Sequence, residues 1–246
     1  MSAATGPASV TGPPAPASGA DGRVPLGASL AVAGVALVAY LLLAPTVSGD
    51  GDGSEFTLVL ATCGMAHPTG YPIYTLVGHL FCRALHALGV GWPYAANAWS
   101  AVGATVAIFF LHAIGTGLAR RAAPGAPAWT RDLAALLPVV IFGFDPIWIN
   151  EAMLAEVYAW HLAWVLGTVA FFLLQIDRLA REEDLPGADV RAAAGWGLLC
   201  GLGLAHHLTS VLVAAPLTLS LLAVLGAARR LRPVLVGAGL GAALVP

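Results

Sequence analysis

Apolar residues in this chain fall into long runs that short polar segments separate. A run of about 20 apolar residues is long enough to cross the hydrocarbon core of a bilayer as a helix rising about 1.5 Å per residue. The run at residues 192–228 is too long for one crossing, and His206-His207 divides it. The pattern predicts an all-α, polytopic bundle of about seven membrane-spanning helices. The expected spans are residues 26–47, 95–118, 133–149, 152–176, both halves of 192–228, and a run after Pro233 that stops at Pro246.

The composition agrees with a membrane protein. Of the 246 residues, 59% are hydrophobic and 10% are charged, whereas a soluble domain carries about 25% charged residues. Residues 1–22, which are rich in Ala, Gly, Pro and Ser, predict a disordered cytoplasmic tail before a membrane domain at 23–246. Because the chain stops inside an apolar run, we expect this domain to be the N-terminal part of a longer protein.

Several classes of function are disfavoured by what the sequence lacks. It has no basic stretch that would bind nucleic acid, and no Walker loop, dinucleotide-binding glycine motif or nucleophile elbow. It also has no local metal-binding signature, so a metal site would have to be assembled from distant segments. A divalent metal therefore has no support from the sequence.

The arginines indicate how the bundle is oriented. If the N-terminus is cytoplasmic, ten of the eleven basic residues fall on the cytoplasmic side and only Arg83 falls outside, as the positive-inside rule requires. Every basic residue is arginine, which we interpret as a GC-rich bacterial genome, so we expect the bacterial inner membrane. The ten are Arg23, Arg120, Arg121, Arg131, Arg178, Arg181, Arg191, Arg229, Arg230 and Arg232.

The same topology brings acids and histidines from four separate stretches to the outer face. Loops of random sequence would not place arginines at one face of a bundle and acids with histidines at the other. This distribution predicts a functional site at the outer face. These residues are Asp52, Glu55, His67, Asp145, Glu151, Glu156, His206 and His207.

Two carboxylates lie just beyond the first span. Asp52 and Glu55 are three residues apart, so one helical turn would place both on one face. A carboxylate at a membrane edge can act as a general base or hold a metal, and a solvated loop is the alternative.

A turn rich in proline and glycine follows. In the segment His67-Pro-Thr-Gly-Tyr71-Pro72, each proline fixes its own φ and restricts the residue before it, which would hold His67 in place. Pro72 can equally open a helix. Apolar residues at helical spacing from Ile73 to Leu88 predict an amphipathic helix in the membrane interface. Arg83 on its polar stripe would contact a lipid phosphate or simply face solvent.

Two later segments carry ionisable groups close to the bilayer. We place Glu156 more than one turn inside the span at residues 152–176, where it must face the bundle interior or a wet cavity. The pair His206-His207 could bind phosphate, donate to an acceptor or ligate a metal, and a structural role at the interface is the alternative.

At these residues the sequence resembles a known membrane family. The matching stretches are residues 51–56, the turn at 67–72, the segment 155–158 that ends at Tyr158, and residues 201–207. The family was long catalogued as a domain of unknown function. It includes the eukaryotic endoplasmic-reticulum O-mannosyltransferase of plexin-type domains and is grouped with the GT-C glycosyltransferases. The acid motif departs slightly, because Ser and Gly are exchanged between the two acids.

The resemblance implies a glycosyltransferase of GT-C fold that uses a polyprenyl-phosphate sugar and an unknown protein, lipid or glycan acceptor. Asp52, with Glu55 beside it, would be the catalytic base of an inverting transfer. The implied substrate-binding residues are His67, Tyr71, Arg83, Glu156, Tyr158, His206 and His207. A transporter or lipid-binding protein with an intramembrane Glu/His pathway is the alternative, although the sequence shows none of the inverted repeats typical of transporters.

Overall fold

A computed structural model describes residues 26–49, 51–68, 71–180 and 187–227, and these are helical apart from the connections between helices. The predicted tail at residues 1–22 and the predicted span after Pro233 lie outside the described residues. The elements are α1 (Leu26–Leu43), α2 (Asp52–Thr62), α3 (Pro72–Ala87), α4 (Trp92–Ala122), α5 (Ala128–Gly143), α6 (Pro146–Met153), α7 (Tyr158–Ala180), α8 (Ala188–His206), the 3-10 turn η1 (Leu208–Ser210) and α9 (Val211–Ala227).

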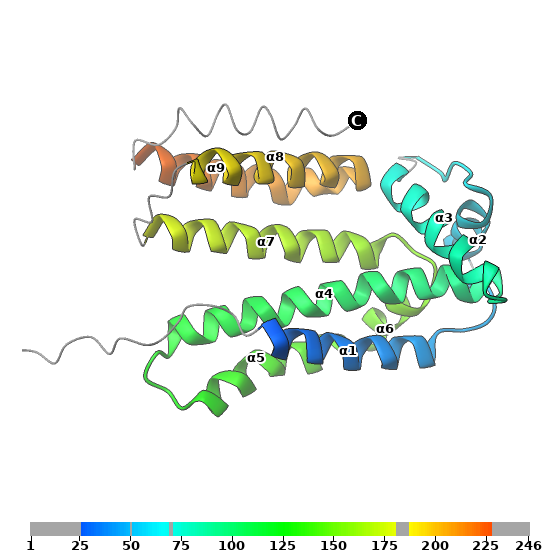
Figure 1. Cartoon of the computed structure of the whole chain (residues 1–246), viewed down its shortest axis with the longest axis horizontal. Helices are drawn as coiled ribbons and strands as arrows, with labels where there is room; N and C mark the ends of the chain where they lie inside the picture. Colours follow the sequence, from blue (N-terminus) through cyan, green and yellow to red (C-terminus); the bar gives the residue numbers. More distant parts are fainter. Residues whose placement is uncertain (1–25, 50, 69–70, 181–186, 228–246) are drawn as a thin grey trace, which may run out of the picture.

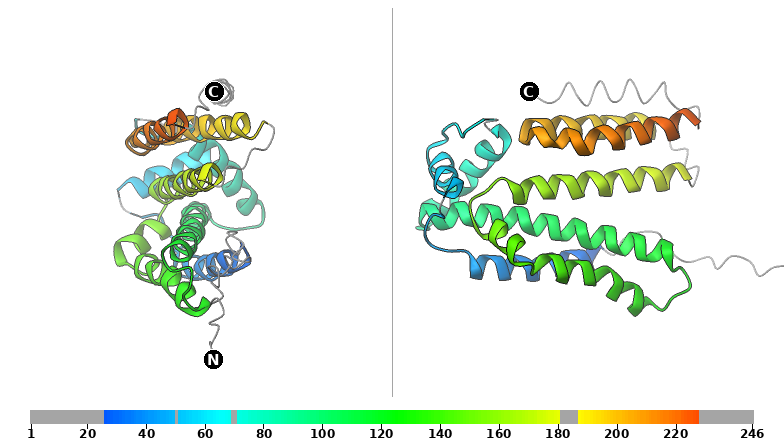
Figure 2. Two further views of the ribbon diagram at one scale, coloured as in Figure 1. Left: turned by 90° about the vertical axis from the view of Figure 1, so that its left-hand side faces the viewer. Right: turned by 180° about the vertical axis from the view of Figure 1, so that it is seen from behind.

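Helix α4 is the axis around which the other helices are arranged. It is 31 residues long and contacts α1, α5 and α6, the helices α2 and α3, and α7. Figure 1 shows α1 and α5 on one side of α4, α7 on the other, and α8 with α9 beyond α7. Helices α2 and α3 lie across one end of this bundle, so the segment between α1 and α4 covers that end (Figures 1 and 2).

Four helices are long and apolar enough to cross a membrane, and the bent pair α5–α6 makes a fifth candidate. The four are Leu26–Leu43, Trp92–Ala122, Tyr158–Ala180 and Leu208–Gly226. The predicted count of seven is therefore not confirmed by the described residues. The split at His206-His207 is confirmed, because α8 ends at His206 and the next helical turn starts at Leu208.

Two predicted spans differ from the observed helices. The segment at residues 133–149 is broken, because α5 and α6 are bent by 71° at Phe144-Asp145. Asp145 caps α6, with its side chain accepting from the N–H groups of Ile147 and Trp148. The span predicted at residues 152–176 begins only at Tyr158, so placing Glu156 inside it was wrong.

Small residues allow close packing along α4. Six buried alanines between Ala95 and Ala107 line it, and close approach of this kind is typical of helix contacts in membranes. Gly103 faces the indole of Trp160 on α7, which donates a hydrogen bond to the Trp99 carbonyl at 2.9 Å. The absence of a side chain at Gly103 thus gives the indole room to reach α4.

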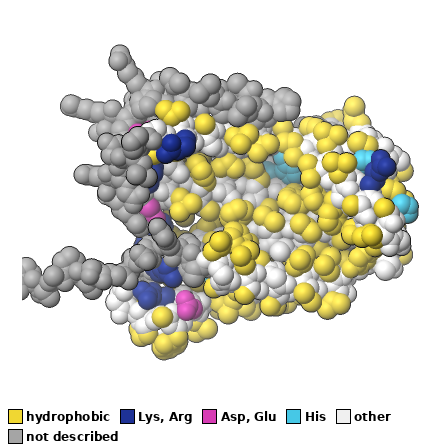
Figure 3. Space-filling model, in the orientation of Figure 1, with side chains coloured by type: hydrophobic (Ala, Val, Ile, Leu, Met, Phe, Trp, Pro, Cys, Tyr) yellow, Lys and Arg dark blue, Asp and Glu magenta, His cyan; other side chains and the backbone are white. Residues whose placement is uncertain are grey.

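The two ends of the bundle carry different chemistry. Arg121 pairs with Asp177, and Arg178 pairs with Asp189 at 2.7 Å, which ties α4, α7 and α8 together at the end away from α2 and α3. Arginine side chains gather at that end of the face seen in Figure 3, although basic side-chain atoms are also visible at the opposite end. The described acids and histidines of the predicted site lie toward the opposite end, where α1, α6 and α8 finish and α7 begins (Figure 1).

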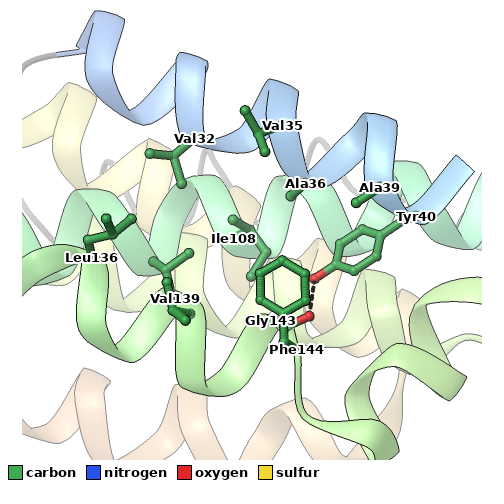
Figure 4. Close-up of a pocket in the computed structure, with 11 residues that line it drawn as sticks. Val32, Val35, Ala36, Ala39, Tyr40, Ile108, Leu136, Val139, Gly143 and Phe144 are labelled. Atoms are coloured by element: carbon green, nitrogen blue, oxygen red, sulfur yellow. Dashed lines mark hydrogen bonds between the residues drawn. The ribbon is translucent and has the colours of Figure 1, made fainter. Parts of the chain in front are cut away.

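An apolar cavity of about 210 Å³ lies between α1, α4 and α5 (Figure 4). At its end the Tyr40 hydroxyl donates to the Gly143 carbonyl and accepts from the Trp148 indole, both at 3.0 Å. These bonds fasten the bend between α5 and α6 to α1. The cavity lies on the side of α4 away from α7.

Packing at Gly103 gives a direct test of the helix arrangement. A Cβ there would lie 2.8 Å from the Trp160 ring, whereas no atom lies within 4 Å of a Cβ at Gly117 on the same helix. Gly103→Ala should destabilise the protein by about 1–3 kcal/mol through overpacking. Gly117→Ala should be neutral or slightly stabilising. Thermal unfolding in detergent, followed by tryptophan fluorescence, measures both, and equal midpoints would contradict this packing.

Candidate functional site

Helix α2 presents the two predicted carboxylates at its first turn. It starts after Gly51, whose φ of 62° is open to glycine but strained for other residues. Asp52 is exposed and Glu55 is half-buried, and both lie in the first turn as the spacing predicted. Gly53 between them is buried, with the Ala155 carbonyl 3.8 Å from the position of a Cβ. The start of α2 therefore packs directly on the connection between α6 and α7.

Glu55 fixes the position of His67. One oxygen accepts from the His67 backbone N–H at 2.7 Å, and the other lies 3.1 Å from Nδ1 of the ring. The backbone hydrogen bond, followed by the ring, holds the pKa of Glu55 below its usual range. His67 thus lies in a defined place, as predicted, but a carboxylate holds it there. Because Glu55 is committed to His67, Asp52 is the freer of the two carboxylates.

Aromatic rings join α2 to the turn and to α3. The buried Phe56 makes edge contacts with His67, Tyr71 and Tyr74, at centroid distances of 5.4–5.7 Å. Tyr71 has a left-handed backbone with φ 44°, and its hydroxyl lies 3.4 Å from Nε2 of His67. Burial, followed by Tyr158 and the acids, raises the pKa of Tyr71. Tyr71 therefore lies at the meeting point of the carboxylates and the histidines.

Glu156 lies in the connection between α6 and α7, close to α2. Its Oε2 is buried and has no hydrogen-bond partner among the described residues. Burial, together with the nearby charges of Asp52 and Glu151, raises the pKa of Glu156 to about 7. A carboxyl group with such a pKa can exchange a proton near neutral pH.

Two buried residues of α4 hold this connection, and sequence reasoning missed both. The Asn97 amide donates to the carbonyls of Pro45 and Val47 at 2.9 and 3.1 Å, and its oxygen accepts from the Ala155 N–H at 2.9 Å. Ser100 accepts from the backbone N–H of Glu156 and donates to its carbonyl, both at 3.1 Å. The sequence did contain a signal for them, because Asn97 and Ser100 are polar residues three positions apart in an otherwise apolar predicted span.

Three histidines form a second part of the site. His161 lies in the first turn of α7, His206 is the last residue of α8 and His207 follows it. The ring centroids are 4.8 Å apart for His161–His207 and 6.0 Å for His161–His206. His207 also contacts Tyr71 at 5.6 Å and the half-exposed Tyr158 at 6.3 Å. The structure thus brings the predicted His pair, Tyr71 and Tyr158 together and adds His161.

Arg83 is the predicted site residue that the structure does not bring to this group. It is exposed on α3, twelve residues after Tyr71, which is about 18 Å along a helix. A helix is present at Pro72–Ala87, but an amphipathic helix in the membrane interface is not confirmed; the face that packs on the protein carries Tyr74, Gly78 and Cys82. Its exposed apolar residues include Leu76, Val77 and Leu80.

The carboxylate side of the site could accept a cation. One ligand atom each from Asp52, Glu55 and His67 lie within 4.8 Å of one another. Oxygen and imidazole ligands suit a divalent ion, but the pairing of Glu55 with His67 accounts for the arrangement without one. The histidines at 161, 206 and 207 form no comparable group among the described residues.

Comparison with known proteins identifies a family. The family model described as the protein O-mannosyl-transferase TMEM260 N-terminal domain matches residues 52–228. A curated relative, protein O-mannosyl-transferase tmem260 of Dictyostelium discoideum, is 28% identical over 181 residues, which are 70% of this chain and 20% of the relative. The chain thus spans about a fifth of that relative's length. No solved structure matches. Because the relative is eukaryotic, the comparison does not support the predicted bacterial membrane.

The contacts of Asn97 predict a local loss of order. Asn97→Ala would leave two carbonyls and one N–H without their partner, which should destabilise the protein by about 2–4 kcal/mol. Hydrogen exchange should rise most at the Ala155 amide. Thr105→Val on the same helix is the control, because the Thr105 hydroxyl donates to the Ala101 carbonyl within α4 and to no other group among the described residues. Unchanged hydrogen exchange at the Ala155 amide in Asn97→Ala would contradict the proposed role of Asn97 in holding the connection between α6 and α7.

The raised pKa of Glu156 predicts how stability depends on pH. The folded state binds this proton more tightly than the unfolded state, with a pKa of about 7 against 4.5. Stability is therefore lost as the pH rises through this interval. Glu156→Gln should raise the free energy of unfolding near pH 8, on the order of 1 kcal/mol after solvent screening, and less near pH 5. Denaturation at both pH values measures this, and an equal gain at both would refute it.

Proposed function

The chain belongs to the family of the protein O-mannosyl-transferase TMEM260 N-terminal domain, and we propose that it is the membrane part of a glycosyltransferase. In this proposal the enzyme transfers a sugar, mannose in the first instance, from a polyprenyl-phosphate donor to a hydroxyl group of an acceptor protein. The observation that carries the proposal is the meeting of Asp52, Glu156 and three imidazoles at one end of an apolar bundle. Family membership favours this reading over a transporter.

The arrangement of the bundle suits a donor with a lipid tail and a polar head. The tail of a polyprenyl phosphate needs the hydrocarbon layer, while its sugar needs a polar site at the membrane surface. We propose that the end with α2 and α3 faces outward, opposite the arginine-rich end. Helix α3 would lie in the interface with its exposed Leu76, Val77 and Leu80 against lipid. Helix α8 and the run after Pro233 would complete about seven spans.

Asp52 is the proposed catalytic base of an inverting transfer. The acceptor oxygen attacks the anomeric carbon, its proton passes to the Asp52 carboxylate, and the bond between that carbon and the phosphate oxygen breaks. The electron pair of the broken bond leaves with the polyprenyl phosphate. Asp52 is favoured over Glu55 because Glu55 already binds both the backbone and the ring of His67.

Glu156 and the aromatic groups have supporting roles in the proposal. Glu156 is close enough to Asp52 for its charge to matter, and it would orient the acceptor hydroxyl or receive a proton after transfer. Tyr71 and Tyr158 would bind the sugar, and His67, fixed by Glu55, would donate to the substrate. Arg83, too far along α3 to reach the same atoms, would contact the phosphate of a neighbouring lipid.

The proposal is tested by transfer of labelled mannose from polyprenyl-phosphate mannose by the full-length protein in membranes. Asp52→Asn should lower kcat by about 10²–10⁴-fold, the usual contribution of a general base. Asp132→Asn is the matched control, since Asp132 is an exposed carboxylate on α5 at the arginine-rich end. It should transfer at the wild-type rate.

Each other outcome has a definite meaning. Full activity of Asp52→Asn would reject Asp52 as the base. No transfer by the wild-type protein, across several lipid-linked sugars and acceptors, would reject the proposed activity.

A further inference from the structure

His207 is held in one protonation form by the residue two positions later. Its Nδ1 accepts from the Thr209 backbone N–H at 3.2 Å and lies 2.7 Å from the Thr209 hydroxyl. A ring nitrogen that accepts from an N–H group cannot carry a proton itself. The proton of the neutral imidazole must therefore be on Nε2, which has no hydrogen-bond partner among the described residues and can donate to a ligand.

Protonation of this ring is disfavoured as well. A positive imidazole would place an Nδ1–H group against the Thr209 N–H, and burial already lowers the pKa of His207. His207 therefore offers a neutral donor near physiological pH. Such a group can stabilise negative charge that develops during a reaction without losing its proton.

The surroundings of His207 point its donor at the candidate site. The ring contacts Tyr71, Tyr158 and His161, of which Tyr158 is 50% exposed. The Thr209 hydroxyl also lies 3.1 Å from Nε2 of His161, so one side chain braces both rings. Nearby, His161 Nδ1 and His206 Nε2 are buried without a partner among the described residues. Unmet hydrogen-bonding capacity of this kind is unusual in a folded protein and suits a ligand site.

The charges of the site indicate which part of a substrate lies there. Asp52, Glu55 and Glu156 are close enough to Tyr71 for their charges to raise its pKa, and an anion beside these carboxylates would be repelled. The described arginines of α4, α5, α7 and α8 lie at the other end of the bundle, and Arg83 is far along α3. An anionic group at this part of the site would therefore depend on neutral donors such as the imidazole N–H groups, because no described arginine is close to them.

We propose that His207, oriented by Thr209, binds the phosphate of the lipid-linked donor through Nε2–H. This inference rests on the proposed function, which supplies the donor, and it assigns the anionic part of that donor to one side chain. As the bond between sugar and phosphate breaks, its electron pair moves onto the phosphate oxygen, and the hydrogen bond from Nε2–H strengthens. No proton leaves His207, because the proton released by the acceptor goes to the carboxylate. Thr209 acts as a positioning residue.

Binding and turnover are measured separately on the full-length protein in nanodiscs. A polyprenyl monophosphate without sugar is the binding probe, and transfer kinetics give KM for the donor and kcat. His207→Ala should weaken binding of the probe about 10- to 100-fold, as for a hydrogen bond to a charged group. His207→Gln keeps an N–H donor and should recover much of that loss. His86→Ala is the control, since His86 is an exposed histidine of α3 bonded to the Val90 carbonyl.

The Thr209 variants separate positioning from general damage. Thr209→Val should raise KM for the donor about fivefold, the effect of one neutral hydrogen bond. Thr209→Ser, which keeps the hydroxyl, should restore the wild-type value. A loss confined to kcat, or equal losses in both variants, would contradict the positioning role.

The remaining outcomes distinguish this inference from the proposed function. Wild-type binding of the probe by His207→Ala overturns the inference even if the enzyme transfers sugar. Probe binding that depends on His207 without transfer of any sugar overturns the proposed function and leaves the phosphate subsite standing. Competition by inorganic phosphate at millimolar concentration would show a site for free phosphate and would overturn the assignment to a lipid-linked donor.

Discussion

The site depends on hydrogen bonds that two polar residues of α4 make inside an apolar bundle. Asn97 joins the chain after α1 to the connection before α7, and Ser100 binds that connection at Glu156 on both its N–H and its carbonyl. Segments without regular structure carry backbone groups that must be satisfied away from water. Because both segments use α4 as their partner, Asp52 and Glu156 come to lie at the same end of the bundle.

Beside these hydrogen bonds the candidate site has two parts, with Tyr71 close to both. The acidic part is Asp52, Glu55 and Glu156, and the imidazole part is His161, His206 and His207. Glu55 is occupied by His67, which leaves Asp52 and Glu156 for chemistry. His207 is occupied on one nitrogen by Thr209, which leaves the other as a donor. In both parts a hydrogen bond inside the protein decides which atom remains for a ligand. In the proposed function, the acid would lie beside the attacking oxygen and the neutral donor beside the departing phosphate.

The packing of tryptophan against glycine explains how the imidazole part of the site is held beside the acidic part. Trp160 and Trp164 of α7 occupy the space left by Gly103 on α4 and Gly203 on α8. Each indole donates to a backbone carbonyl of the neighbouring helix, at 2.9 Å to Trp99 and 2.8 Å to Leu199. Helix α7 is thereby held between α4 and α8, and this places His161 beside His206-His207.

The sequence by itself determined the class of protein, the end of the bundle that carries the acids and histidines, and the break at His206-His207. The length of the hydrophobic runs, the order of charged residues between them and the positions of prolines depend only on residues close in sequence. They can therefore be recognised from the sequence alone. Only the tertiary structure decided that Glu156 lies outside a helix, that α5 bends into α6 and that Arg83 is remote. It also decided that Asn97, Ser100 and His161 contact the residues of the candidate site. Those facts depend on contacts between residues such as Asn97 and Ala155, far apart in sequence, and no local pattern encodes them.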